Sequence, residues 1–153
     1  MVLKGVSKNF DWSFFKRNIV AGNVPSLNQT EKSNEVIISE KVSLLLKLKT
    51  GDPLYCYFYN EGESAPRSRK FIISGIYNTS LEEFDEMYVL CDLKNVQGLN
   101  NWSDNQISGY ELMIDDFNVL DQVFDVQRDV TLNNATDNSM LKVYSIVTRY
   151  SML

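Results

Sequence analysis

The chain has 153 residues, of which 44% are hydrophobic, so it can bury a core in one domain or in two small lobes. Its 20 acidic and 15 basic side chains give a net charge of -5, which disfavours binding to nucleic acid and to anionic membrane surfaces. No apolar run approaches the roughly 20 residues of a membrane-spanning helix, and the first residues lack the pattern of a signal peptide. We expect a soluble domain, although an extracytoplasmic part of a membrane protein has the same composition.

The residue types present exclude several kinds of site. The sequence contains no histidine and only two cysteines, Cys56 and Cys91, so a histidine-based catalytic triad or a His–Cys metal site cannot form within it. We interpret both cysteines as small buried apolar residues, and a disulfide between them stays open because the sequence does not give their separation. No phosphate-binding loop or nucleophile elbow occurs, so we expect no enzyme, no catalytic residues, no metal and no cofactor.

The first fifty residues predict two helices and one strand. Residues 2–6 form a short apolar piece that Gly5 interrupts, and Asp11 then opens a helix over residues 12–18 that turns Trp12 and Phe15 towards a core. Residues 22–34 have the composition of a surface loop. A brief strand at residues 35–38 follows.

The second helix begins after Ser39, a good N-cap residue. The spacing of Val42, Leu45 and Leu46 predicts that these three side chains face the core. Gly51 suits a left-handed C-cap and Pro53 cannot continue a helix, so we expect the helix to end before them.

A strand with two distinct faces is predicted at residues 54–59. Its alternation directs Leu54, Cys56 and Phe58 inward, and Tyr55, Tyr57 and Tyr59 to the opposite face. We interpret the tyrosines as ordinary stabilisers of a sheet; the alternative is that they bind a peptide or an acyl chain. Residues 60–68 then form the tip of a hairpin.

The centre of the chain is predicted to be a core hairpin of two strands, residues 71–77 and 87–91. Its buried side chains are expected to be Phe71, Ile73, Ile76, Val89 and Leu90. Gly75 marks a bulge or a close approach of another backbone. The acidic residues 82–86 between the strands predict a solvated turn, with a divalent-cation site as the less favoured alternative. Asp92 is expected to cap a helix that carries Leu93, Val96 and Leu99 on one side.

The polar residues 100–106 predict a boundary between two lobes. Beyond it we expect a strand at residues 110–114, a helix at 117–130 and a strand at 143–147, about half of a ferredoxin-like unit. The predicted class is therefore α+β, with a β-rich lobe of short helices at residues 1–106 and a βαβ lobe at residues 107–153.

Several stretches, in the same order along the chain, resemble the extracytoplasmic domain of MacB-like or FtsX-like ABC transporter permeases, particularly the lipoprotein-releasing type. They are residues 3–6 (LKGV), 11–15 (DWSFF), 36–39 (VIIS), 48–52 (LKTGD), 75–79 (GIYNT), 82–85 (EEFD) and 88–90 (YVL). The resemblance implies that residues 1–106 are a β-rich lobe inserted into a split βαβ lobe, of which residues 107–153 are the returning half. Because the other half is missing, strands 110–114 and 143–147 are expected to expose apolar surface and to cause self-association.

The resemblance also implies a location and partners. The domain is expected on the periplasmic face of the bacterial inner membrane, as part of a permease that works with a partner ATPase. In lipoprotein-releasing relatives a hairpin at the position of residues 60–69 contacts a periplasmic chaperone, and Pro66 with Arg69 resembles its returning arm. Pro66, Arg67 and Arg69 are therefore the candidate partner-binding residues, because arginine offers planar donors to carboxylates. The alternative is a solvated hairpin turn.

Two functional hypotheses follow. In the first, the domain couples ATP-driven motion to the release or export of a substrate such as a lipoprotein, and does no chemistry itself. In the second, it is a free-standing extracytoplasmic ligand-binding or sensor domain that holds a small ligand against the tyrosine face.

Overall fold

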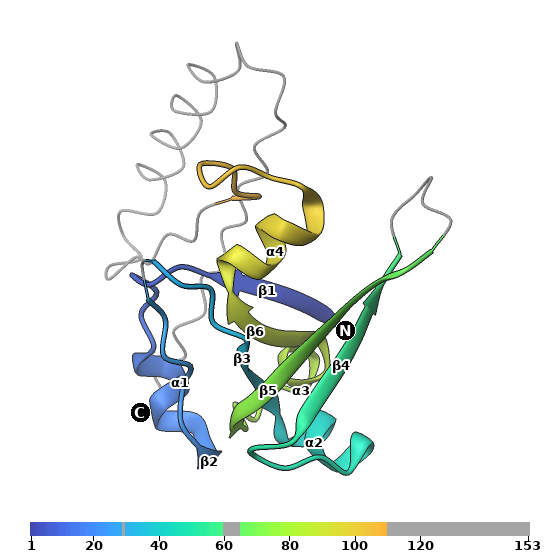
Figure 1. Cartoon of the computed structure of the whole chain (residues 1–153). Helices are drawn as coiled ribbons and strands as arrows, with labels where there is room; N and C mark the ends of the chain where they lie inside the picture. The colour runs from blue at the N-terminus through green and yellow to red at the C-terminus, as the bar shows by residue number, and fades with distance from the viewer. Residues whose placement is uncertain (29, 60–64, 110–153) are drawn as a thin grey trace. The chain divides into compact units, whose positions relative to one another are not determined.

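The computed structural model describes residues 1–28, 30–59 and 65–109 (Figure 1). These residues form an α+β fold in which a mixed sheet of six strands carries four short helices, which confirms the expected class. The chain divides into two compact units, Met1–Asn105 and Gln106–Leu153. The strands and helix expected beyond residue 109, and the self-association expected through them, lie outside the described residues and stay predictions.

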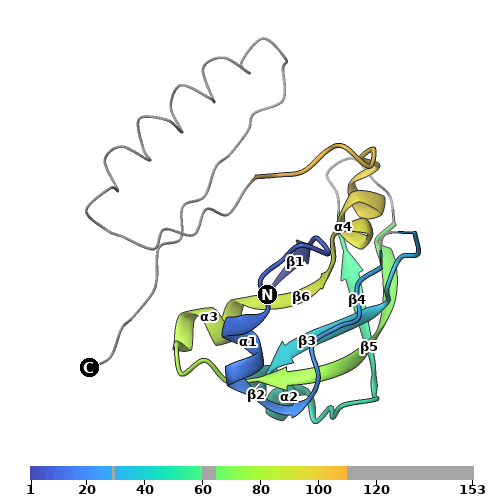
Figure 2. The same cartoon turned by 90° about the vertical axis from the view of Figure 1, so that its left-hand side faces the viewer.

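The sheet mixes parallel and antiparallel pairs (Figures 1 and 2). Its strands are β1 (Val2–Val6), β2 (Ile19–Gly22), β3 (Glu35–Ser39), β4 (Pro53–Phe58), β5 (Arg67–Tyr77) and β6 (Tyr88–Asp92). The helices are α1 (Ser13–Asn18), α2 (Glu40–Leu46), α3 (Glu82–Met87) and α4 (Leu93–Asn100). The strand order is β1-β6-β3-β5-β2, and β4 pairs with the first half of β5. The β1–β6 and β3–β5 pairs are parallel, and the others are antiparallel.

The core lies on both faces of the central strands. Val36, Ile37 and Ile38 of β3 are completely buried, which explains their continuous apolar sequence. The expected core residues Phe71, Ile73, Ile76, Val89 and Leu90 are all between 0% and 7% exposed, so that prediction is confirmed.

The expected core hairpin is wrong in its pairing. Both predicted strands exist, but β3 lies between β5 and β6 and pairs with each of them. The connection from β5 to β6 contains α3 and is too long for a tight hairpin turn, so it leaves room for a third strand. A strand as apolar as β3 needs cover on both faces, which the centre of the sheet provides.

Gly75 has the role expected from the sequence. A Cβ atom at this position would lie 2.4 Å from the backbone oxygen of Asn23, so only glycine allows the approach of that segment. The β3–β5 register also shifts between Val36 and Ile37, opposite Ile73 and Gly75.

Gly5 does not interrupt the first apolar piece. Strand β1 runs through this residue. A Cβ atom at Gly5 would lie 2.8 Å from Cγ2 of Val96 and 2.9 Å from Cα of Leu93, so a side chain does not fit there. The glycine thus lets α4 pack closely on β1. The short strand β2 was not predicted; it lies between the expected helix and the expected loop and shares only Gly22 with that loop.

Helix α2 confirms one expectation and corrects another. The Ser39 hydroxyl accepts a hydrogen bond from the Val42 backbone N–H at 3.2 Å, and Val42 is buried. Leu45 and Leu46, however, are 78% and 43% exposed. The helix has only seven residues and ends at Lys47, its left-handed C-cap residue with φ of 56°; Gly51 also has a positive φ, of 90°, but lies beyond the end of the helix.

Candidate functional site

The β4–β5 hairpin is the part of the fold where the sequence placed the candidate binding residues. Its six residue pairs run without a register shift from Pro53 opposite Ile72 to Phe58 opposite Arg67. In Figure 1 the two strands extend together away from the centre of the sheet. Because β4 pairs only with β5 among the described strands, its second backbone edge has no strand partner there.

The two faces of the hairpin differ as the sequence predicted. Leu54 is 3% exposed, whereas Tyr55 and Tyr57 are 57% and 63% exposed, and Tyr59, just after the strand, is 82% exposed. The outward direction of the tyrosines is therefore confirmed. We use the term outer face for the side of the hairpin that carries Tyr55, Tyr57, Ser68, Lys70 and Ile72.

The outer face is aromatic and apolar, with one ammonium group. The Nζ atom of Lys70 lies 5.9 Å from the centre of the Tyr55 ring, a cation–π contact between register partners. Ile72 is 38% exposed on the same side. Such a surface can stack on aromatic or apolar groups and attract a single negative charge.

The candidate residues Pro66, Arg67 and Arg69 lie at the start of β5 but in different environments. Pro66 is exposed and precedes the strand. Arg67 is half-buried, and its Nη1 atom donates to the Leu99 carbonyl at 2.7 Å and to Oδ1 of Asn101 at 3.0 Å. The Nη1 atom of Arg69 donates to the carbonyl of the adjacent Ser68 at 2.9 Å.

Arg67 therefore joins the hairpin to the C-terminal end of α4. Carbonyl groups at a helix end lack partners within the helix and carry partial negative charge, so a guanidinium there is favourable. Asn101, the left-handed C-cap residue with φ of 56°, supplies the second acceptor. The sequence gave no signal for this contact, because more than thirty residues separate its two partners. Reversing the Arg67 charge is therefore expected to perturb the domain itself.

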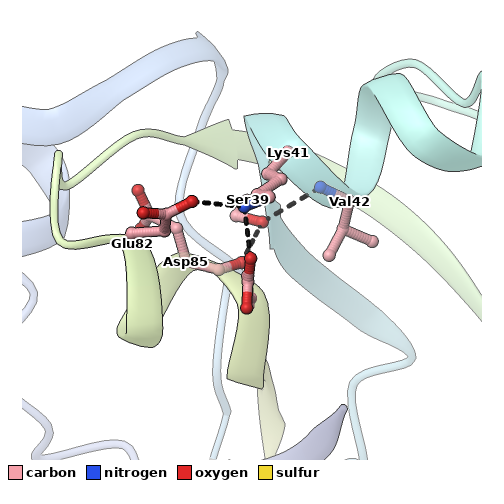
Figure 3. A network of polar contacts seen from close by, with 6 residues as sticks. Ser39, Lys41, Val42, Glu82 and Asp85 are labelled. Atoms are coloured by element: carbon pink, nitrogen blue, oxygen red, sulfur yellow. Dashed lines mark hydrogen bonds and ion pairs between the residues drawn. The ribbon is translucent and has the colours of Figure 1, made fainter.

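A second polar cluster joins α2 to α3 (Figure 3). The Lys41 ammonium pairs with Glu82 at 2.9 Å and also with Glu86. The Ser39 hydroxyl donates to the backbone carbonyl of Asp85 while it caps α2. The hydrogen bonds that Lys41 donates to Glu86 and Glu82 raise the pKa of Lys41, and the Lys41 ammonium lowers the pKa of Glu82.

The acidic run at residues 82–86 forms helix α3 rather than the expected turn. Asp85 is 7% exposed, and its carboxylate accepts hydrogen bonds from the N–H and the hydroxyl of Thr79. Within the part of the chain that the structure describes, no group of three or more potential metal ligands occurs. Glu82 and Glu86 pair with Lys41 of α2, and Asp85 bonds to Thr79, so these three carboxylates have partners within the chain.

The two cysteines are free thiols, Cys56 half-buried and Cys91 buried. Burial raises the pKa of both thiols, and the nearby Asp92 adds to this effect at Cys91. Burial also raises the pKa of the Tyr77 hydroxyl. This hydroxyl donates a hydrogen bond to the Tyr88 carbonyl at 2.7 Å. These groups are therefore protonated near neutral pH.

None of the helices in the described residues has the length and apolar character that a membrane span requires. No protein-family model matches the chain, and no curated protein was found to match it.

Proposed function

We propose that this chain is an extracytoplasmic domain of a MacB-like or FtsX-like ABC transporter permease on the periplasmic face of the bacterial inner membrane. In this proposal the domain receives motion from the rest of the permease and its partner ATPase and transmits it to a substrate, with lipoprotein release as the favoured process. It binds and moves, but it does no chemistry.

The observation that carries the proposal is where the family-like stretches lie in the fold. Residues 3–6, 88–90, 36–39 and 75–79 lie on or directly after β1, β6, β3 and β5, which are consecutive neighbours in the sheet. The similar residues therefore belong to one packed architecture, although they are dispersed along the sequence. A resemblance of this kind concerns the fold itself rather than one surface motif.

The hairpin adds a second, smaller support. The resemblance implies a projecting hairpin between the strand after Gly51 and the strand leading to Gly75, and the β4–β5 pair occupies this position. Its outer face is exposed, as a partner-binding element requires.

The first test is whether the full-length gene product has apolar stretches of about 20 residues on both sides of this segment. Such flanking stretches are expected, and their absence would overturn the proposal.

The second test uses charge changes in the intact transporter. Arg69→Glu leaves the contact between Arg67 and α4 in place, so it is expected to preserve folding while slowing the transfer of a lipoprotein to its acceptor. Lys8→Glu is the control, because it makes the same charge change at an exposed position outside the hairpin. Normal transfer with Arg69→Glu, and with the double reversal of Arg67 and Arg69, removes this segment from the mechanism.

A binding or sensor domain is the second candidate function, and the exposed tyrosines of the outer face favour it. It predicts that a small aromatic or acyl ligand quenches the fluorescence of Tyr55 and Tyr57, and that flanking membrane segments are missing.

A further inference from the structure

The last turn of α2 exposes three consecutive leucines. Leu44, Leu45 and Leu46 are 73%, 78% and 43% exposed. Among the large hydrophobic residues that the structure describes, only Tyr59 is more exposed than the first two. In Figures 1 and 2 helix α2 lies on the side of the fold away from α4. Neighbouring apolar side chains that are this exposed favour contact with another apolar medium or surface.

The leucines are held on a well-defined projection, which we call the leucine tip, residues 44–49. The Leu48 N–H donates to the Ser43 carbonyl at 3.0 Å, the Ser43 hydroxyl donates to the Leu48 carbonyl at 2.6 Å, and Leu48 packs against the core. The Lys49 N–H donates to the Asp52 carboxylate at 2.7 Å. The tip therefore needs little further ordering before its leucines make a contact.

The directions of the three leucines favour a fluid partner over a folded one. Successive residues of an α-helix lie about 100° apart, so Leu44, Leu45 and Leu46 spread over about 200° of the helix circumference. A groove or a flat protein face covers one side of a helix, as the spacing of anchors in groove-bound helices shows. The boundary between lipid headgroups and acyl chains instead surrounds an inserted tip on every side.

Charge at the tip suits the phosphates of a lipid surface. Residues 41–51 contain three lysines and no acidic residue. Lys41 pairs with two glutamates of α3, whereas Lys47 and Lys49 are exposed beside the leucines. The net charge of -5 disfavours adsorption of the chain as a whole, but salt screens charges that lie more than about 8 Å apart. The local excess of lysine therefore decides the attraction at the tip.

We propose that the leucine tip inserts into the surface of a lipid bilayer. Leu44, Leu45 and Leu46 enter the boundary between headgroups and acyl chains, while Lys47 and Lys49 stay at the level of the phosphates. An anchor of this size gives weak, reversible binding. The inference rests on α2 and the residues after it, so it does not depend on the proposed transport function, and its failure leaves the test of the flanking apolar stretches unaffected.

Cosedimentation of the full chain with vesicles tests the leucines. The vesicles are of phosphatidylcholine with about one quarter phosphatidylglycerol, an anionic lipid. The unchanged chain is expected to bind them. Leu44→Gln with Leu45→Gln keeps good helix formers and should weaken binding by at least about tenfold. Tyr55→Thr with Tyr57→Thr is the matched control, because it removes two exposed rings from the outer face and should leave binding unchanged.

The lysines are tested separately. Lys47→Asn with Lys49→Gln removes both charges, and asparagine tolerates the left-handed backbone at position 47. Binding to the anionic vesicles is expected to fall about fivefold or more, with little change on pure phosphatidylcholine. Lys8→Gln with Lys32→Gln removes the same charge at exposed positions outside the tip and should have a smaller effect.

Three results would overturn the proposal. They are a chain that binds neither kind of vesicle, a folded leucine variant that binds as tightly as the unchanged chain, and a leucine variant that alters only the association state of the lipid-free chain, which would make the tip a protein contact. Circular dichroism checks that the variants fold, and Leu45→Gln alone replaces the double variant if that one does not.

Discussion

The centre of the sheet and the β4–β5 hairpin are both rich in apolar residues but differ in what surrounds them. Strand β3 has strands on both edges and side chains packed on both faces, and Val36, Ile37 and Ile38 are fully buried. Strand β4 has one paired edge and one packed face, and Tyr55 and Tyr57 remain more than half exposed. Stability therefore resides in the centre, while the hairpin keeps apolar surface available for contacts.

The largest difference between the two regions should appear on truncating a central side chain. Ile73 is completely buried in β5, and Ile73→Ala is expected to lower the free energy of unfolding by about 2–5 kcal/mol through lost burial and the cavity left behind. Tyr57→Thr on the hairpin replaces an exposed side chain by a β-branched one that also suits a strand, and it should change the free energy of unfolding by less than about 0.5 kcal/mol. Urea denaturation measures both. Equal effects would contradict the division into a stabilising centre and an exposed hairpin.

A second substitution tests close packing in the centre. Gly75→Ala places a Cβ atom 2.4 Å from the Asn23 backbone oxygen, and the backbone must shift to accept it. We expect a loss of about 1–3 kcal/mol in unfolding free energy. Gly98→Ala is the control, since nothing lies within 4 Å of a Cβ there and alanine favours a helix. A neutral Gly75→Ala with unchanged cooperativity would show that the segment at Asn23 does not press on β5.

A smaller effect is expected where the hairpin meets α4. Arg67→Met removes hydrogen bonds to Leu99 and Asn101 but keeps much of the side chain, so we expect a loss of about 1 kcal/mol. Arg69→Met, which loses only a bond to the neighbouring Ser68, should cost less. Hydrogen exchange of the last turn of α4 should accelerate in Arg67→Met alone. Equal exchange in the two variants would mean that the hairpin is not held by α4.

The smallest effect belongs to the exposed ion pairs between α2 and α3. Lys41 lowers the pKa of Glu82, so this pair stabilises the fold above the usual glutamate pKa and loses its effect as the pH falls through the lowered value. Lys41→Met should therefore lower the denaturation midpoint slightly at pH 7, and the deficit should shrink as the pH falls below the usual glutamate pKa. Lys8→Met removes an exposed charge elsewhere and controls for net charge. A deficit that grows on acidification would contradict the pairing.

The sequence alone determined the elements whose signals are local. Alternation over residues 54–59 separated the inner and outer faces of β4, because side chains in a strand point alternately to opposite sides. Ser39 and Asp92 marked the starts of α2 and α4, and the side chains of both accept hydrogen bonds from the first turn of the helix. The buried residues of β5 and β6 were equally clear, because long apolar runs need cover.

Only the tertiary structure decided which elements meet. Pairing β3 between β5 and β6 depends on contacts between residues far apart in the chain, and no local pattern encodes them. The same reason explains the contact of Arg67 with α4 and the need for Gly5 beneath Val96. Leu45 and Leu46 fit a helical pattern and yet are exposed. Such a pattern leads to burial only where another element lies against the helix, and the sequence alone does not show where that happens.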